Sequence, residues 1–249
     1  MTPRPWRPPG LEQLAALGIE LGAPGGALVE ERVAWTPSHR IIASEYAGEN
    51  LFDRLTSATA YDRLRDEITA LREIADLTSP HAQHEAGRIE LVRPEDRLFG
   101  PGAGLVMASF AYPARASRFS DGSAGTYYAA RALETSVAET RYHEEVTLRG
   151  SGPCVTEKTV IHAELDADLL DIRAGHPCPP GVYDPDEYGA GQTFGAMVRR
   201  LGGYGVVYDS VRHAGGECAA IFRPPALSGA RAVRTMQYYW DGTRVFDVR

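Results

Sequence analysis

The stretch RASRFSDGSAGTYYAARALETSVAETRYH, residues 115–143, carries most of the information about the fold. Asp121 to Gly125 tolerate the backbone angles of a chain reversal and predict a turn. The β-favouring run Thr126 to Tyr128 predicts a short strand, and the Ala-, Leu- and Glu-rich sequence from Ala129 onward predicts a helix. The stretch therefore predicts a turn, a strand and a helix, with polar groups along all three.

The geometry of the predicted helix places the carboxylates of Glu139 and Glu134 on different sides of the helix. At about 100° per residue, Leu133 and Val137 share an apolar stripe, and Glu139 lies on the flank of that stripe. Glu134 falls on the other side of the helix, near Arg141, where solvent is its expected neighbour. Two interpretations of Glu139 stay open. It faces a cleft, or it is an ordinary boundary residue in contact with solvent, as most charged residues are.

A second informative stretch is YGVVYDSVRHAGGECAAIFRP, residues 204–224. It predicts a buried strand, a polar turn that holds Ser210, Arg212 and His213, a Gly-Gly reversal and a second strand. Polar residues at the end of a buried strand are a common way to build a site on a rigid base.

Together the two stretches resemble the RES-domain toxins of Xre/RES toxin–antitoxin pairs. The resemblance is carried by Arg118 in SRFSDG, Tyr128 ten residues later, Glu139 eleven residues after that, and Ser210 in YDSVRHAGGECAAIFRP. It spans roughly residues 40–224. The chain departs from shorter members at Phe119, where they carry Trp, and in a long segment before residue 118 that they lack.

The pattern of elements favours a mixed α+β fold. Strands are predicted at residues 104–111, 155–165, 205–208, 218–222 and 232–240, interrupted by the helix that carries Glu139 and by a helix at 188–201. This order is not a regular strand–helix alternation, so a doubly wound parallel sheet is disfavoured. The resemblance implies a fold like that of ADP-ribosyltransferases, with two small sheets around an NAD cleft.

The resemblance also implies a reaction, in which NAD is the substrate and the bond between nicotinamide and ribose is cleaved. The leaving ring is a pyridinium, which departs without a proton, so the site must position and stabilise an oxocarbenium-like ribose. The implied catalytic residues are Arg118 as a pyrophosphate contact, Tyr128 beside the nicotinamide, Glu139 against the developing positive charge, and Ser210 as a hydrogen-bond partner of a ribose or phosphate. The implied cofactor-binding residues are Arg40, Phe119 and Arg212.

Each of these residues also has a simpler structural interpretation. Arg118 could pair with Asp121 across the turn, Tyr128 could be a core aromatic residue, and Ser210 could cap the turn before the Gly-Gly reversal. Arg40 could be a surface residue that flanks a strand. The order and spacing of the four residue types favour the functional interpretation.

Cleavage of the nicotinamide–ribose bond leaves ADP-ribose, and the resemblance implies more than one acceptor for it. The first hypothesis is degradation of NAD with phosphate or water as acceptor, as the toxin of a toxin–antitoxin pair. The resemblance then implies an Xre-type antitoxin as partner. The alternatives are ADP-ribosylation of a protein target and a non-catalytic module that binds NAD or a partner. A serine hydrolase built from Asp209, Ser210 and His213 is disfavoured, because adjacent residues on one turn cannot easily align and the sequence has no GxSxG motif.

Composition limits the remaining classes of function. A chain of 249 residues with a net charge of -7 and a pI near 5.5 does not favour binding to nucleic acid or anionic membranes. Apolar runs are too short to span a membrane, and the N-terminal sequence lacks the apolar core of a signal peptide, so we expect a cytoplasmic protein. Three cysteines without CxxC spacing predict reduced thiols. His81 and His84 do not match a metalloprotease motif, and no metal is expected.

The chain is predicted to consist of two parts. Residues 1–39 form a Pro-rich arm followed by a short helix at 11–21, and residues 40–249 form the RES-like domain, whose first strand starts at residues 40–42. A helical insertion at about 50–100 includes a pattern with Leu64, Ile68, Leu71 and Ala75 at helical spacing. Whether this insertion covers a sheet face, forms a homodimer surface or shapes the cleft entrance stays open.

Overall fold

The structure is a computed structural model that describes residues 27–48, 53, 57, 59, 63, 92–111 and 115–249. The predicted helix at 11–21, and nearly all of the helical pattern predicted between residues 50 and 77, lie outside these residues.

Seven strands form one hydrogen-bonded sheet in the order β1-β2-β5-β4-β3-β6-β7. The strands are β1 (Val29–Ala43), β2 (Tyr127–Ala130), β3 (Cys154–Asp171), β4 (Gly205–Asp209), β5 (Glu217–Ile221), β6 (Leu227–Trp240) and β7 (Val245–Val248). The helices with defined bounds in the described part of the chain are α5 (Ala103–Ala111), α6 (Leu133–Thr147) and α7 (Gly189–Arg200). Short 3-10 turns lie at Ser44–Tyr46, Pro94–Asp96 and Pro224–Ala226. The predicted mixed α+β fold is confirmed.

The sheet consists of two groups of strands that are joined at both sides. The long antiparallel strands β1, β3 and β6 form one group with β7, and β2, β5 and β4 form the other. The groups meet where His39 pairs with Ala130, and again where the end of β3 pairs in parallel with β4. The two sheets predicted from the resemblance are therefore present as two parts of one continuous sheet.

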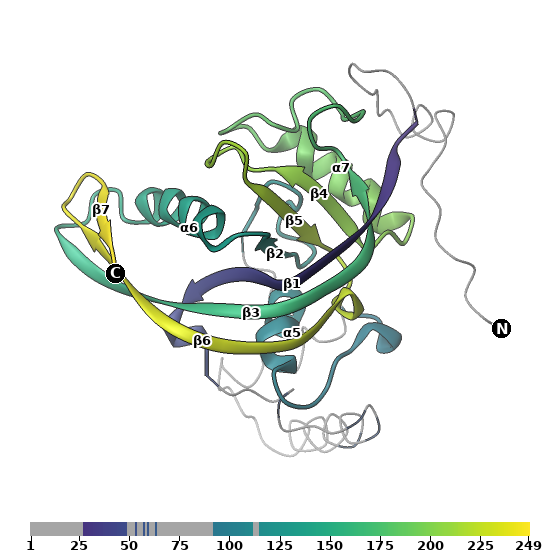
Figure 1. The fold of residues 1–249 in the computed structure, drawn as a ribbon, viewed down its shortest axis with the longest axis horizontal. Helices are drawn as coiled ribbons and strands as arrows, with labels where there is room; N and C mark the ends of the chain where they lie inside the picture. The colour runs from purple at the N-terminus through teal and green to yellow at the C-terminus, as the bar shows by residue number, and fades with distance from the viewer. Residues whose placement is uncertain are drawn as a thin grey trace, which may run out of the picture.

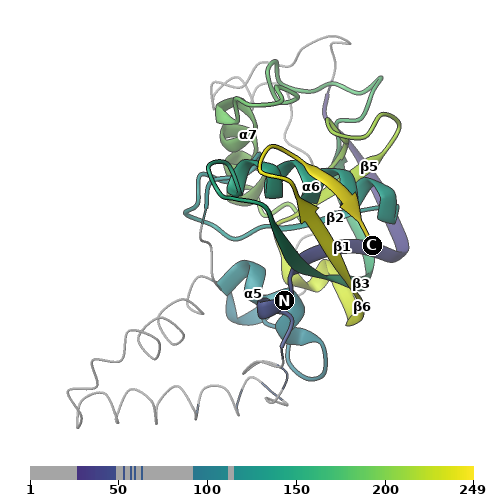
Figure 2. The ribbon, with the colours of Figure 1, turned by 90° about the vertical axis from the view of Figure 1, so that its left-hand side faces the viewer.

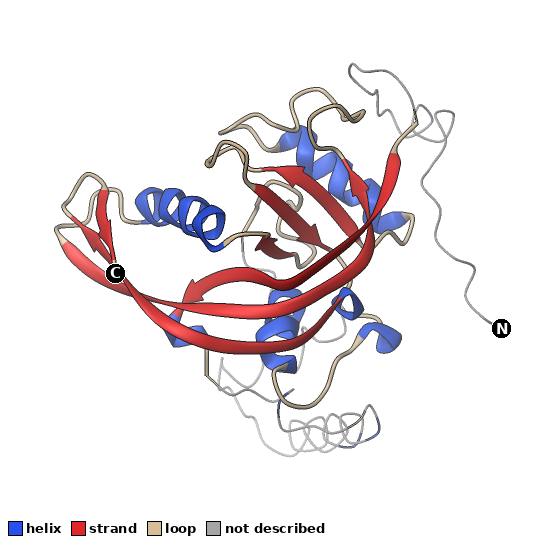
Figure 3. Ribbon diagram, in the orientation of Figure 1, coloured by secondary structure: helices blue, strands red, loops and turns tan. Residues whose placement is uncertain are grey.

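Three hydrophobic clusters hold these layers together. The first lies between the two strand groups and includes α5, the second lies between β2-β5-β4 and α7, and the third lies between the long strands and α6. Successive residues of β3 serve different clusters, since Val160 packs toward α6 and Ile161 toward α5. Figures 1 and 3 accordingly show α6 and α5 on opposite sides of the curved long strands.

Helix α6 is fixed at the end of the sheet by the β6–β7 hairpin, which lies beside it in Figure 2. The backbone N–H of Val245 donates to the carboxylate of Glu145 at 2.9 Å, and Arg141 donates to the carbonyl of Val245. Strand β7 was not predicted from the sequence. Its four residues are too few for a clear alternation of apolar and polar positions.

The prediction of a strand at residues 104–111 is wrong, because these residues form α5. A short, largely apolar run has no periodicity that distinguishes a buried helix from a buried strand. Six residues of α5 are buried, and its Ala, Leu and Met residues favour helix.

Two predicted boundaries of secondary-structure elements also differ from the observed ones. Ala129 and Ala130 belong to β2, because they pair with Ala219 and Cys218 of β5, and α6 begins only at Leu133. Arg40 lies near the end of β1 and not at the start of a strand. Because β1 pairs with β3 from Val29 onward, the sheet continues across residue 39, where the sequence analysis divides the chain.

No helix in the described part of the chain is long and apolar enough to cross a membrane. Among the described residues, no group of three or more His, Cys, Asp or Glu side chains could hold a metal ion. His81 and His84 lie outside these residues.

Candidate active site

Glu139 and Ser210, separated by 71 residues in the sequence, are in direct contact. The Ser210 hydroxyl donates to Glu139 Oε1 at 2.5 Å. The same oxygen of Ser210 accepts hydrogen bonds from the backbone N–H groups of Arg212 at 3.1 Å and His213 at 3.0 Å. Ser210 therefore caps its own turn, as the simpler interpretation predicts, and also donates to the Glu139 carboxylate, a contact that neither interpretation includes. Glu134 is exposed, as predicted.

Glu139 is partly buried, and its Oε1 lies near buried side chains. The thiol of Cys218 lies 4.0 Å from this oxygen, and Cys218 and Tyr208 are buried. Burial, together with the negative charge of Glu139, raises the pKa of the Cys218 thiol well above its usual value. Burial likewise raises the pKa of Tyr208. Both side chains are therefore neutral at physiological pH, and Cys218 is not an activated nucleophile.

Arg118 is buried, with 7% of its surface exposed. Its Nη1 donates to the carbonyl oxygens of Val182 and Asp184, each at 2.7 Å, and its guanidinium lies 4.9 Å from the centre of the Tyr188 ring. The alternative pairing with Asp121 does not occur, since Asp121 accepts hydrogen bonds from Ser123. Within the described residues, Nε and Nη2 of Arg118 make no hydrogen bond.

Helix α7 fixes the backbone of Arg118 and Phe119 by close packing. A Cβ atom at Gly191 would lie 2.3 Å from the carbonyl oxygen of Arg118, and one at Gly195 would lie 2.3 Å from that of Phe119. The two glycines are four residues apart and therefore share one helix face. Only residues without a side chain allow α7 to approach the Arg118 segment this closely.

We expect Gly195→Ala to destabilise the protein by about 1–3 kcal/mol, because the new methyl group has no space and the backbone must shift. Gly189→Ala is the matched control, since its Cβ would meet no atom within 4 Å. Urea unfolding of both variants checks this prediction. Equal stability of the two variants would show that α7 does not pack tightly on the Arg118 segment.

Tyr128 supports the loop that carries Arg118. Its hydroxyl shares a 2.8 Å hydrogen bond with Ser117 Oγ and accepts one from the backbone N–H of Phe119 at 3.0 Å. Burial raises the pKa of this phenol. The ring is partly buried against the cluster beneath α7, so Tyr128 combines a core contact with a polar anchor.

Phe119 does not fit the predicted cofactor contact. Its ring is fully buried, at 0% exposure, and packs edge-on against Tyr208 with the ring centres 5.0 Å apart. A side chain without accessible surface cannot touch a ligand, so Phe119 belongs to the core.

Arg212 contacts the same segment as Arg118, residues 182–188. Its guanidinium stacks 3.3 Å from the centre of the Tyr142 ring, donates to the carbonyl of Pro185 and lies 3.7 Å from Asp186 Oδ1. In the described part of the structure, its buried Nε has no hydrogen-bond partner. Both Arg118 and Arg212 therefore hold the 182–188 segment, and each keeps unpaired donors.

Arg40 lines a different region, a cavity of about 1230 Å³. Tyr128, Ser117 and Lys158 contribute to the same cavity, whereas Glu139 and Ser210 are not among its lining residues. Arg40 donates to the carbonyl of Tyr128 at 3.1 Å, and its buried Nε has no partner among the described residues. Burial lowers the pKa of this guanidinium. The structure thus does not place Arg40 beside the Glu139–Ser210 pair.

The serine-hydrolase arrangement is not formed. His213 contacts Ser210 only through its backbone N–H, and its Nδ1 lies 2.8 Å from Thr135 Oγ1. The carboxylate of Asp209 accepts from the backbone N–H of Ala174 at 2.7 Å. Ser210 therefore has no imidazole base.

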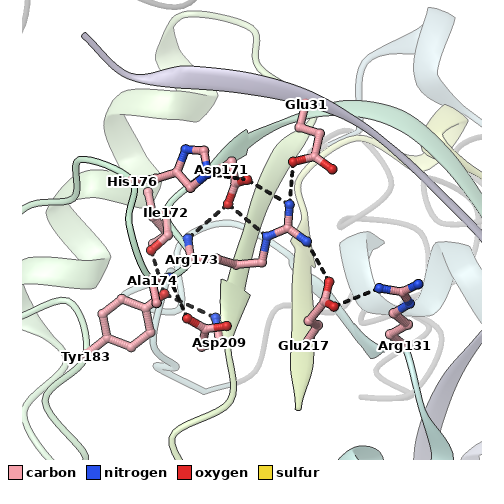
Figure 4. A network of polar contacts seen from close by, with 10 residues as sticks. All are labelled: Glu31, Arg131, Asp171, Ile172, Arg173, Ala174, His176, Tyr183, Asp209 and Glu217. Atoms are coloured by element: carbon pink, nitrogen blue, oxygen red, sulfur yellow. Dashed lines mark hydrogen bonds and ion pairs between the residues drawn. The ribbon is translucent and has the colours of Figure 1, made fainter. Parts of the chain in front are cut away.

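A polar network beneath the turn anchors the ends of β4 and β5 (Figure 4). Arg173 contacts the carboxylates of Glu31, Asp171 and Glu217, the last at 2.6 Å. Asp209 and Glu217 pair across β4 and β5, directly before and after the turn of residues 210–216. Arg173 thus holds the strand ends that flank the turn carrying Ser210.

Several contacts of this site were not predicted from the sequence, namely those of Thr135, Tyr142, Arg173 and Tyr188. For Thr135 and Tyr142 a signal existed, because they lie four residues before and three residues after Glu139 and so share its helix face. For Arg173 there was none, since its partners come from three separate strands.

One comparison with known proteins shows a family. The RES domain family model matches residues 91–241. No curated protein is similar enough in sequence to count as a match. Four chains of solved structures match. One of them belongs to the crystal structure of the M. tuberculosis MbcT–MbcA toxin–antitoxin complex, with 12% identity, coverage of 83% of this chain and 85% of that chain, and a TM-score of 0.39. A likeness at this level does not define the activity of this chain.

Proposed function

Because this chain belongs to the RES domain family, we propose that it cleaves the nicotinamide–ribose bond of NAD and acts as the toxin of a bacterial toxin–antitoxin pair. The observation that carries the proposal is the 2.5 Å hydrogen bond between Ser210 and Glu139. It joins two residues that sequence resemblance alone assigns to one site, and it does so beside Arg212.

In the proposed reaction, the ribose carbon gains positive charge as neutral nicotinamide leaves. Glu139 would stabilise this charge, and its hydrogen bond from Ser210 fixes the direction of the carboxylate beforehand. The buried Cys218 beside Glu139 would strengthen the interaction by limiting water on that side of the carboxylate, because charges interact more strongly away from water. No metal ion is needed, since a pyridinium departs without Lewis-acid assistance.

The cations near the pair would hold the phosphate groups of the substrate. Arg118 offers Nε and Nη2, and a guanidinium meets two phosphate oxygens at once. Tyr128 is proposed to border the nicotinamide, since it supports the Arg118 loop. Arg40 is proposed as a further phosphate contact, because it lines the neighbouring cavity and carries a positive charge.

For the acceptor, we propose phosphate or water. Arg212 supports phosphate, because its side chain is a cation with 13% of its surface exposed and its turn also carries Ser210. The test is to incubate the purified protein with NAD, with and without inorganic phosphate, and to identify the products by chromatography.

Free nicotinamide with a phosphorylated ADP-ribose is expected if phosphate is the acceptor, and unmodified ADP-ribose if water is. Nicotinamide release only after a protein target is added would favour ADP-ribosylation of proteins instead. Binding of NAD with no release under any condition would contradict the enzyme proposal and favour a non-catalytic module.

The proposal includes a protein partner and a place of action. A toxin that consumes NAD requires restraint, and the family resemblance points to an Xre-type antitoxin that covers the site in the cytoplasm. Coexpression with the product of a neighbouring gene, followed by a growth assay and copurification, tests this part.

A further inference from the structure

Helix α6 contacts the turn of residues 210–213 at three successive positions of one face. Thr135 contacts His213, Glu139 contacts Ser210, and the ring of Tyr142 contacts Arg212. Spacings of four and three residues place these α6 side chains one above the other. The pair of the proposed active site is therefore the middle contact of a row of three.

The first contact of the row is buried and short. Thr135 has 0% exposed surface, and its Oγ1 lies 2.8 Å from Nδ1 of His213. The backbone N–H of His213 in turn donates to Ser210 Oγ at 3.0 Å. Thr135 thus fixes the residue whose main chain holds the Ser210 hydroxyl.

The backbone of the turn packs closely against this contact at Gly216. A Cβ atom at Gly216 would lie 2.5 Å from Thr135 Oγ1 and 2.9 Å from His213 Nδ1. Gly216 also closes the turn, because its carbonyl oxygen accepts from the backbone N–H of Ser210 at 2.8 Å. Thr135 and His213 therefore pack against the residue that closes the turn carrying Ser210.

We propose that Thr135 and His213 are positioning residues, which hold the Ser210 hydroxyl on the Glu139 carboxylate. Neither residue touches the substrate in this account. The effect on turnover rests on the proposed function, whereas the effect on the Ser210–Glu139 distance does not.

Thr135→Val tests the proposal, because it keeps the shape of the side chain and removes the hydroxyl. We expect kcat for nicotinamide release to fall by about tenfold to a hundredfold, because small displacements at a reacting centre lower the rate by this much. The KM for NAD should change by less than about twofold, since the phosphate contacts remain. Thr135→Ser, which keeps the hydroxyl, should retain more than about half of the activity.

The matched control is Thr140→Val on the same helix. The Thr140 hydroxyl donates to the carbonyl of Ser136 within α6 at 2.6 Å and does not contact the turn. A fall in kcat shared equally by Thr135→Val and Thr140→Val would reduce the role of Thr135 to general helix stability. Equal loss in Thr135→Ser and Thr135→Val would also overturn the proposal.

A crystal structure of Thr135→Val gives a measurement that needs no activity. We expect the distance from Ser210 Oγ to Glu139 Oε1 to increase from 2.5 Å to beyond about 3.5 Å, the limit of a hydrogen bond. An unchanged distance would refute the positioning role. If the wild-type protein releases no nicotinamide, the proposed function fails, and this distance still decides the inference.

Discussion

Glu139→Gln is expected to lower the rate of nicotinamide release from NAD by about a hundredfold to a thousandfold, the usual effect of removing one electrostatic contact to a transition state. The substitution removes the negative charge and keeps the shape, and the amide oxygen can still accept the Ser210 hydrogen bond. NAD should still bind, because its phosphate contacts are unchanged. Turnover is measured by chromatography and binding by calorimetry.

Glu134→Gln is the control for this experiment. Glu134 lies on the exposed side of the same helix, so its loss should leave turnover within about twofold of the wild-type value. Equal activity of Glu139→Gln and the wild-type protein would remove the carboxylate from the mechanism. Loss of NAD binding in Glu139→Gln would assign Glu139 to binding instead.

Arg173→Met should produce the largest loss of stability, about 3–5 kcal/mol. Asp171 is fully buried, with 0% exposure, and the variant would leave its charge without the guanidinium that now lies 2.7 Å away. Glu217 would lose its contact at 2.6 Å in the same step. Because Glu217 directly follows the turn that carries Ser210, the rate of nicotinamide release should fall as well. Urea unfolding measures the change in stability.

The control for Arg173 is Arg32→Met. Arg32 and Asp166 form a pair at 2.7 Å, but their side chains are 57% and 61% exposed. Exposed pairs add little to stability, so this variant should unfold close to the wild-type midpoint. A loss of stability in Arg173→Met no larger than in Arg32→Met would contradict the view that the network anchors the strand ends.

The pH dependence of stability should report the same contact. Burial acts to raise the pKa of Asp171, but the hydrogen bonds from Arg173 outweigh it and lower the pKa below the usual value of 3.8. The contribution of Asp171 is therefore complete above that value and is lost as the pH falls through the lowered pKa. Stability measured between pH 5 and pH 2 should fall less steeply in Arg173→Met than in the wild-type protein.

Local patterns in the sequence were enough to predict much of the fold. The strands around Ser210 and the two helices α6 and α7 were found because their patterns are long or are bounded by Gly residues. The assignment of α5 as a strand failed because a largely apolar run has no clear periodicity. The start of the helix was predicted too early, because pairing with β5 extends β2 as far as Ala130. Joining of the two strand groups depends on contacts between distant segments, which local patterns do not contain.

The candidate site was predictable to a similar degree. The order and spacing of Arg118, Tyr128, Glu139 and Ser210 pointed to one site, and the contact of the last two is present. The burial of Phe119 was not predictable, because an aromatic residue after a turn fits both a core and a ligand contact. The 182–188 segment, which both arginines hold, carries no signal that links it to them.

The most direct test of the account is a crystal structure of Glu139→Gln with NAD bound. We expect the ribose next to nicotinamide to lie within hydrogen-bond distance, about 3.2 Å or less, of the side chains of residue 139 or Ser210. We expect the pyrophosphate to lie at Arg118. NAD bound wholly in the Arg40 cavity, with no atom at either residue of the pair, would contradict the account.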